Sequence, residues 1–269
     1  GNLRVRRDII LRDLTSDAEF APLYSRPVIA TQIEAPIFLL SDHLSLRPGF
    51  TGTWTKDSPY GWAPQFTVRY APKPTWDIWM SVGRGFRLPD VWELYGDRGN
   101  TVGNPDLTPE SGWRGDVGMT IHMTPSRHSH GQFTLVGFAK RDTDRIVYVQ
   151  NATTTMVPVN FGETRSMGLE TGWSFQMKDI LTMDGQATLN WTTNLDTRPA
   201  LNGNQLPRTP FLTAQIQATI QATDAIQFGL GSSFTAGNYW DATNWYLSAP
   251  RPLQRAWVRW HPGLGPISL

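Results

Sequence analysis

Hydrophobic and polar residues alternate along this chain with a period of two, in one segment after another. In residues 76–82 the apolar side chains share one face: Trp76, Ile78, Met80 and Val82. In residues 212–220 five apolar residues alternate with the polar residues Thr213, Gln215, Gln217 and Thr219. This pattern is typical of a β-strand with one apolar and one polar face.

The alternating segments are long. Many run to about ten residues or more, which is the length that a tilted strand needs to cross a bilayer. Strands of globular proteins are most often about five or six residues long. Length and alternation together therefore predict strands that span a membrane.

The connections between these segments alternate in length. Short turns are predicted near residues 40–42, 72–74, 124–130, 178–180, 223–225 and 262–265, and longer polar loops near 13–25, 56–62, 86–109, 142–163, 196–210 and 238–251. Short turns at one end and long loops at the other are typical of outer-membrane barrels.

We count roughly twelve complete strands and a thirteenth that begins at residues 266–269. The predicted fold is all-β: a partial antiparallel transmembrane β-barrel of roughly 12–13 strands from a larger barrel. Residues 1–269 are expected to form a single β-barrel region, incomplete at both ends. An open edge in lipid leaves backbone groups unpaired, at a cost of several kcal/mol each, so further strands are needed from this chain or another.

Composition narrows the classes of function. The net charge of +1 and the scattered Lys and Arg argue against a nucleic-acid partner. The chain has 0 Cys, which excludes thiol nucleophiles and cysteine metal sites. A mean hydropathy of −0.34 and 12 Trp fit a barrel in which half of each strand faces a polar lumen.

Enzyme and metal motifs are weak. No hydrolase, Walker or dinucleotide-binding pattern is present, so we expect no catalytic residues and no cofactor. His128 and His130 are close in sequence but have no nearby third ligand, and we interpret them as part of a solvated turn rather than a metal site.

Three short motifs follow one another between residues 85 and 110. They read Gly85-Phe86-Arg87-Leu88-Pro89, then Glu93-Leu94-Tyr95, then Gly103-Asn104-Pro105-Asp106-Leu107-Thr108-Pro109-Glu110. The chain here resembles the barrel of TonB-dependent outer-membrane receptors, which shows these motifs in the same order and at similar spacing. Residues 160–170 and 206–210 resemble later parts of the same barrel.

The motif residues also have a physical interpretation without the family. Gly83 and Gly85 let a strand bend or approach a neighbour closely. Pro89 is expected to open a short helical turn over residues 90–95. Glu110 is expected to accept hydrogen bonds or to pair with Arg87 or Arg84. We therefore expect the motif residues to be mainly architectural.

The resemblance implies the C-terminal barrel part of a receptor in the Gram-negative outer membrane, with the plug domain absent from this chain. It implies import of a scarce solute such as a ferric siderophore. The expected partners are outer-membrane lipid, the rest of the barrel and the plug in the same or another chain, the TonB complex acting through that plug, and a small-molecule ligand. The alternative is a plug-less or split barrel with a structural or partner-binding role; a soluble β-rich enzyme or glycan-binding domain is disfavoured by the extent of the apolar faces.

Two sets of residues are candidates for contact with a solute. The external-loop candidates are Trp240, Trp245, Tyr246 and Arg251, which could stack on a catecholate or a sugar, although packing in an interfacial aromatic girdle explains the aromatic residues as well. The residues predicted to line the lumen are Arg69, Arg114, Asp116, Glu170, Asp184, Asn190, Gln215 and Gln217.

Overall fold

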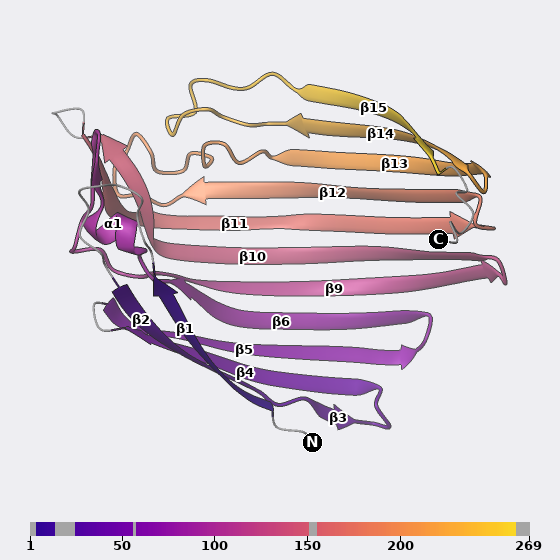
Figure 1. Cartoon of the computed structure of the whole chain (residues 1–269), viewed down its shortest axis with the longest axis horizontal. Coiled ribbons are helices and arrows are strands. Elements are labelled where there is room, and N and C mark those ends of the chain that lie inside the picture. The colour runs from indigo at the N-terminus through magenta and orange to yellow at the C-terminus, as the bar shows by residue number, and fades with distance from the viewer. Residues whose placement is uncertain (1–3, 14–24, 56–57, 151–154, 262–269) are drawn as a thin grey trace, which may run out of the picture.

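The computed structural model describes residues 4–13, 25–55, 58–150 and 155–261, which form one large curved antiparallel sheet (Figure 1). Its strands and one helix are β1 (Arg4–Asp13), β2 (Ser25–Glu34), β3 (Ile37–Leu39), β4 (Leu44–Thr55), β5 (Ser58–Lys73), β6 (Trp76–Arg87), α1 (Val91–Tyr95), β7 (Asp97–Arg98), β8 (Thr101–Val102), β9 (Glu110–Ser126), β10 (Ser129–Gln150), β11 (Met156–Met177), β12 (Leu181–Asn194), β13 (Leu212–Thr223), β14 (Ile226–Ala236) and β15 (Arg251–Trp260).

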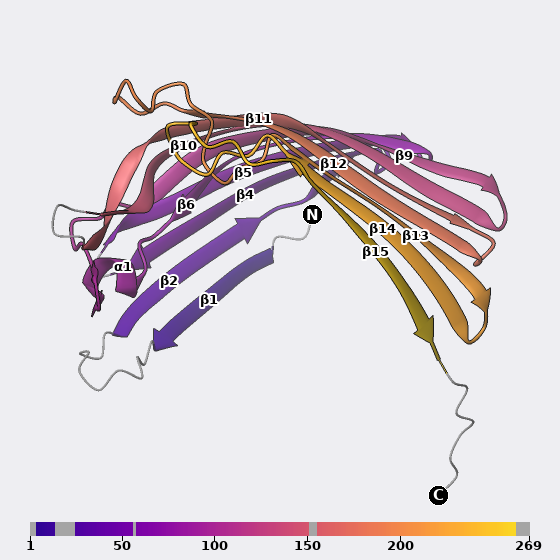
Figure 2. The same cartoon turned by 90° about the horizontal axis from the view of Figure 1, so that it is seen from above.

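The long strands pair in the order of the sequence. The path is β1-β2-β4-β5-β6-β9-β10-β11-β12-β13-β14-β15, while the short strands β3, β7 and β8 lie off it. Figure 2 shows the sheet bent into an arch, and in the described part of the chain β1 and β15 are not hydrogen-bonded to each other. The all-β, antiparallel, partial-barrel prediction is confirmed.

The strand register separates two faces. One cross-strand row on the convex face runs through apolar residues and one glycine: Val68, Met80, Val117, Gly137, Leu169, Leu189 and Leu212. A row on the opposite face is mostly polar: Asp77, Thr120, Thr134, Gly172, Gln186, Gln215 and Ser233. The residues predicted to line the lumen all fall on this second face, which encloses a hollow of about 590 Å³.

Apolar side chains are not gathered into an ordinary core. Among the described residues, prolines apart, the buried hydrophobic side chains are Leu94 and Leu107, and both lie in the connection between β6 and β9 rather than in the sheet. Large apolar residues of the convex face, such as Val117 and Leu135, are exposed. The described residues contain no helix long and apolar enough to cross a membrane.

Two predicted loops are wrong. Residues 142–163 are mostly strand, because β10 continues to Gln150 and β11 begins at Met156, with Val147 opposite Val159. Residues 58–62 likewise belong to β5. β-branched pairs continue the ladder here beyond the point where polar residues suggested that it ends. The predicted thirteenth strand at 266–269 lies outside the described residues.

The two faces predict opposite responses to an added charge. Because the apolar face is expected to meet lipid, Leu135→Arg should destabilise the folded protein in a bilayer by about 2–4 kcal/mol. Gln132→Arg, on the polar face of the same strand, is the matched control and should cost less than about 1 kcal/mol. Urea unfolding of the full-length protein in lipid vesicles measures both changes, and equal destabilisation would show that lipid does not cover the apolar face.

Candidate functional site

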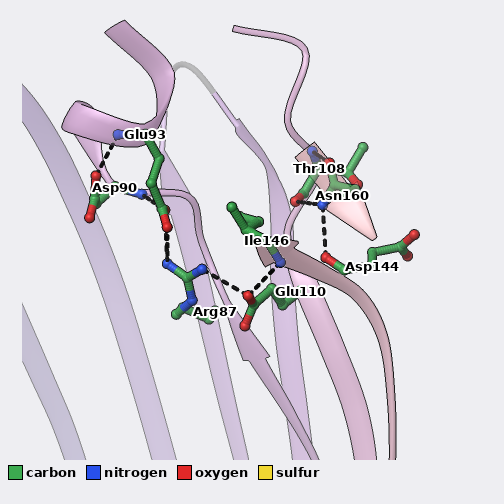
Figure 3. Close-up of polar contacts among 8 residues, drawn as sticks. All are labelled: Arg87, Asp90, Glu93, Thr108, Glu110, Asp144, Ile146 and Asn160. Carbon is green, nitrogen blue, oxygen red and sulfur yellow. Dashed lines mark hydrogen bonds and ion pairs between the residues drawn. The ribbon is translucent and has the colours of Figure 1, made fainter. Parts of the chain in front are cut away.

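The connection between β6 and β9 folds back onto the polar face of the sheet (Figure 3). It begins with α1, where Asp90 and Glu93 form a capping box: the Asp90 carboxylate accepts from the Glu93 N–H at 2.7 Å, and the Glu93 carboxylate accepts from the Asp90 N–H at 2.8 Å. Such reciprocal bonds satisfy two N–H groups that a helix start leaves unpaired. The short helix predicted over residues 90–95 is therefore confirmed.

Arg87 joins this helix to two strands. Its guanidinium donates to both carboxylate oxygens of Glu93, at 3.0 and 2.8 Å, and to the Glu110 carboxylate at 2.8 Å. Glu110 also accepts from the Ile146 N–H at 2.7 Å, which brings in β10. The expected pairing of Glu110 with Arg87 is confirmed, whereas Arg84 instead donates to the Trp62 carbonyl at 2.6 Å.

Two asparagine side chains fasten the second half of the connection to β10 and β11. Asn104 donates to the Pro158 carbonyl at 3.0 Å. Asn160 exchanges hydrogen bonds of 2.8 Å with the backbone of Thr108 and donates to the Asp144 carbonyl at 2.8 Å. Since amide side chains pair well with backbone groups, these bonds replace a β-ladder where none can form.

Buried apolar residues accompany these hydrogen bonds. Leu94, Leu107, Pro89 and Pro158 are buried. Gly103 is needed for close approach, because a Cβ at that position would lie 2.6 Å from the Tyr95 nitrogen. We call the set formed by Arg87, Glu93, Asn104, Leu107 and Glu110 the loop anchor.

The remaining motif residues have lesser contacts. The Phe86 ring lies against Gly61, and Pro109 directly precedes β9. Pro105 is exposed in a turn. A Cβ at Gly85 would meet no atom within 4 Å, so the close approach expected in this motif occurs at Gly83, where a Cβ would lie 3.2 Å from the Pro64 carbonyl.

A second pair of connections, residues 195–211 and 237–250, lies at the same end of the sheet and is held together by amide side chains. Asn204 donates to the Ala242 carbonyl at 3.0 Å. Asn244 donates to the Gln205 carbonyl at 2.9 Å and accepts from its N–H at 2.7 Å. The sequence showed only two polar, Asn-rich loops, because bonds across some 39 positions leave no local pattern.

Asp241 organises the tip of the second connection. Its carboxylate accepts from the hydroxyl of Thr243 and from the N–H groups of Thr243, Trp245 and Tyr246. The hydrogen bond from the Thr243 hydroxyl lowers the pKa of Asp241, and partial desolvation acts in the opposite direction. With the hydrogen bonds from the three N–H groups, the pKa falls to about 2. The charged form of this carboxylate therefore holds the tip in shape.

This arrangement presents two of the predicted aromatic residues to solvent. Trp245 is 80% exposed and Tyr246 is 70% exposed, and Trp240 is exposed as well. Arg251 lies apart as the first residue of β15, opposite Thr235, and in the described part of the chain no ring contact joins it to these aromatic residues. The aromatic tip is a candidate surface for a flat ligand, without help from Arg251.

The comparison with protein families decides what this architecture is. A family model described as TonB-dependent receptor-like β-barrel matches residues 22–261. The chain belongs to this family. Members of the TonB-dependent receptor family are transporters of the Gram-negative outer membrane rather than enzymes.

Solved structures with this fold include receptors and transporters. The siderophore receptor PirA from Pseudomonas aeruginosa is similar at 15% identity with a TM-score of 0.65, over 87% of this chain and 40% of that one. The copper transporter OprC is similar at 17% identity with a TM-score of 0.65, over 90% of this chain and 41% of that one. The FrpB iron transporter from Neisseria meningitidis is similar at 15% identity with a TM-score of 0.65, over 89% of this chain and 39% of that one. The chain thus spans about two fifths of the length of these proteins.

If the loop anchor of this TonB-dependent receptor barrel holds residues 90–110 in place, its removal should lower both the stability of the protein and the order of these residues. Arg87→Met leaves the buried Glu93 carboxylate without its cation, so the full-length protein should lose about 2 kcal/mol of stability. Backbone amides of residues 90–110 should also exchange hydrogen faster, as measured by mass spectrometry. Arg127→Met, in the short turn between β9 and β10 at the other end of the sheet, is the control and should change neither quantity; unchanged exchange in Arg87→Met would contradict the anchoring role.

The Asp241 carboxylate predicts how the aromatic tip responds to pH. Because the pKa of Asp241 is lowered in the folded tip, the order that it supplies is complete above its ordinary pKa of about 3.9 and is lost as the pH falls through about 2. The chain has 0 Cys, so Ala242→Cys provides a unique site for a spin label.

The label should be immobile at pH 7 and pH 4 and become mobile near pH 2. Adding Asp241→Asn should make the label mobile already at pH 7. Asp106→Asn, in the connection between β6 and β9, should leave the spectrum of the spin label unchanged. A label in the Asp241→Asn protein that stays immobile at pH 7 would show that the carboxylate does not organise the tip.

Proposed function

We propose that the full-length protein imports a scarce solute, such as a ferric siderophore, across the outer membrane, driven through a plug by the TonB complex. Membership of the TonB-dependent receptor barrel family carries this proposal. The described sheet supplies the wall of such a path, with an apolar convex face and a polar concave face.

The solute class is supported by what the similar structures are. PirA is a siderophore receptor and FrpB is an iron transporter, whereas OprC is a copper transporter. Within this chain, the exposed aromatic tip at Trp245 and Tyr246 suits a ligand with flat rings, since aromatic faces stack on such groups. Catecholate siderophores have this chemistry, and we propose them ahead of a bare metal ion.

The polar face suits contact with a plug. On this face, strands β12 and β13 present amide and hydroxyl groups, including Gln186, Thr188, Gln215 and Gln217. These groups can exchange hydrogen bonds with a packed domain without the cost of burying unpaired charge. The remaining strands of the barrel, which would pair with β1 and β15, are proposed to come with the plug from the same or another chain.

The aromatic tip makes a prediction about uptake. In cells that carry the full-length gene, import of ⁵⁵Fe from a catecholate siderophore should depend on the gene and on TonB. Trp245→Ala together with Tyr246→Ala should raise the dissociation constant of the ferric siderophore by about thirtyfold, because each stacked ring contributes about 1 kcal/mol and a loss of about 1.4 kcal/mol weakens binding about tenfold.

Trp54→Ala, an exposed tryptophan on β4 away from these loops, is the control and should leave the dissociation constant unchanged. Uptake that does not depend on TonB would overturn the proposed mechanism. Uptake that depends on TonB but shows no preference among catecholate, hydroxamate and metal-only substrates would overturn the proposed solute class alone.

A further inference from the structure

A row of outward side chains on the convex face combines three arginines with a tryptophan. The register places Arg84 of β6 opposite Trp113 of β9, and Trp113 opposite Arg141 of β10. Arg141 in turn lies opposite Arg165 of β11. Opposed residues hold their Cβ atoms about 4.5–5.5 Å apart, so the four side chains form one continuous basic row.

The positive charge of this row is only partly neutralised. Arg141 pairs with Glu163, which lies on β11 one same-face row nearer the loops than Arg165. Arg84 donates to the Trp62 carbonyl and lies 4.3 Å from the centre of the Trp62 ring, and both of these partners are neutral. Among the described residues Arg165 has no carboxylate partner, so three guanidinium groups face one carboxylate and the row carries a net charge of +2.

Two arginines directly opposite each other are unfavourable unless an anion lies between them. Like charges in this cross-strand position repel and destabilise the pair. Arg141 and Arg165 are both exposed, so an anion can reach both guanidinium groups from outside the sheet. Guanidinium groups bind phosphate with two parallel hydrogen bonds, which makes phosphate the best match for the pair.

Directly below the basic row, the convex face is hollowed by an apolar groove of about 720 Å³. Its sides are formed by larger side chains, among them Val82, Met167, Leu169 and Trp191. The centre of the groove is lined by small residues, namely Gly115, Gly137 and Ala139. A Cβ at Gly137 would lie 3.7 Å from both Leu169 and Val117, which is ordinary contact, so the backbone has room for a side chain that the sequence leaves out.

The opposite rim of the convex face has no such row. The outward residues four rows further toward the short turns are Trp76, Ile121, Phe133 and Trp173, all of them apolar or aromatic. The basic row therefore marks the rim that carries the long connections. In barrels of this kind the long loops are external.

We propose that this face binds one phosphate-bearing anionic lipid of the external leaflet, with a phosphate on Arg141 and Arg165 and an acyl chain in the groove. The proposal rests on the outer-membrane location proposed above. The spacing supports it, because the basic row lies one row beyond the apolar residues Val82, Ala139 and Met167, where the headgroup of a lipid meets its chains. Trp113 beside the arginines suits the same interfacial depth.

Native mass spectrometry of the full-length protein in a non-ionic detergent tests the headgroup. The probe is lipid A with both phosphates, compared with its dephosphorylated form and with inorganic phosphate. The wild-type protein should retain one lipid A, and Arg141→Gln with Arg165→Gln should weaken retention by on the order of tenfold. Arg114→Gln, at the same height on the polar face, is the matched control and should change nothing.

A second variant tests the groove separately from the charge. Gly137→Leu fills the groove without a backbone clash and should also weaken lipid A retention several-fold, while Gly172→Leu on the polar face should not. Thermal unfolding without lipid checks that both variants fold.

Three outcomes would overturn the proposal. They are equal retention of dephosphorylated lipid A, displacement of lipid A by inorganic phosphate at the same concentration, and unchanged retention in the arginine variant. The assay uses no solute and no TonB, so loss of import with intact lipid binding would count against the proposed function alone. If cell fractionation placed the protein outside the outer membrane, both the proposed lipid site and the proposed function would be overturned.

Discussion

Continuous hydrogen bonding between strands that are neighbours in sequence is the constraint on which the rest of this structure depends. A surface that meets lipid cannot leave backbone N–H and C=O groups unpaired, so each strand must lie against the next along its full length. The ladder from β1 to β15 satisfies this demand in the described part of the chain, apart from its two outer edges. Once the register is fixed, it also fixes the face of the sheet on which each side chain lies, because successive residues of a strand point to opposite faces.

That register accounts for features that look unrelated in the sequence. Leu135 and Gln132 lie on opposite faces of β10, because an odd number of positions separates them. Leu135 therefore lies on the apolar convex face, and Gln132 lines the polar hollow. The same parity places Arg84, Trp113, Arg141 and Arg165 together, although they are spread over some 80 positions. A single slip by one residue would move all of them to the other face.

The connections follow a different principle from the sheet. With no long ladder to hold it, the segment between β6 and β9 is fastened by ion pairs, by amide-to-backbone bonds and by the burial of Leu94 and Leu107. Burial of apolar surface, which stabilises the centre of a soluble domain, is therefore concentrated at one end of this molecule. The loop anchor holds the connection against β10 and β11, and the amide bonds around Asn244 do the same for the later loops.

The sequence by itself determined the fold class, the presence of long strands and the face that each alternating residue takes. It did so because a period of two is a local property, readable within ten residues such as those of β13. It also predicted the helical turn at Asp90, and it named Arg87 and Arg84 as alternative partners for Glu110, between which the structure decided for Arg87. It misjudged the length of β10 and β11, because polar residues within a long ladder look like the start of a loop.

Only the tertiary structure decided which distant residues meet. The amide bonds between Gln205 and Asn244 and the bond from Asn104 to Pro158 depend on how the loops fold over the end of the sheet, and no local pattern encodes that. The groove beneath the basic row likewise requires Gly115, Gly137 and Ala139 to come together from neighbouring strands. The alternation along a strand determines the face on which a side chain lies, whereas the register between strands determines which residues are its neighbours.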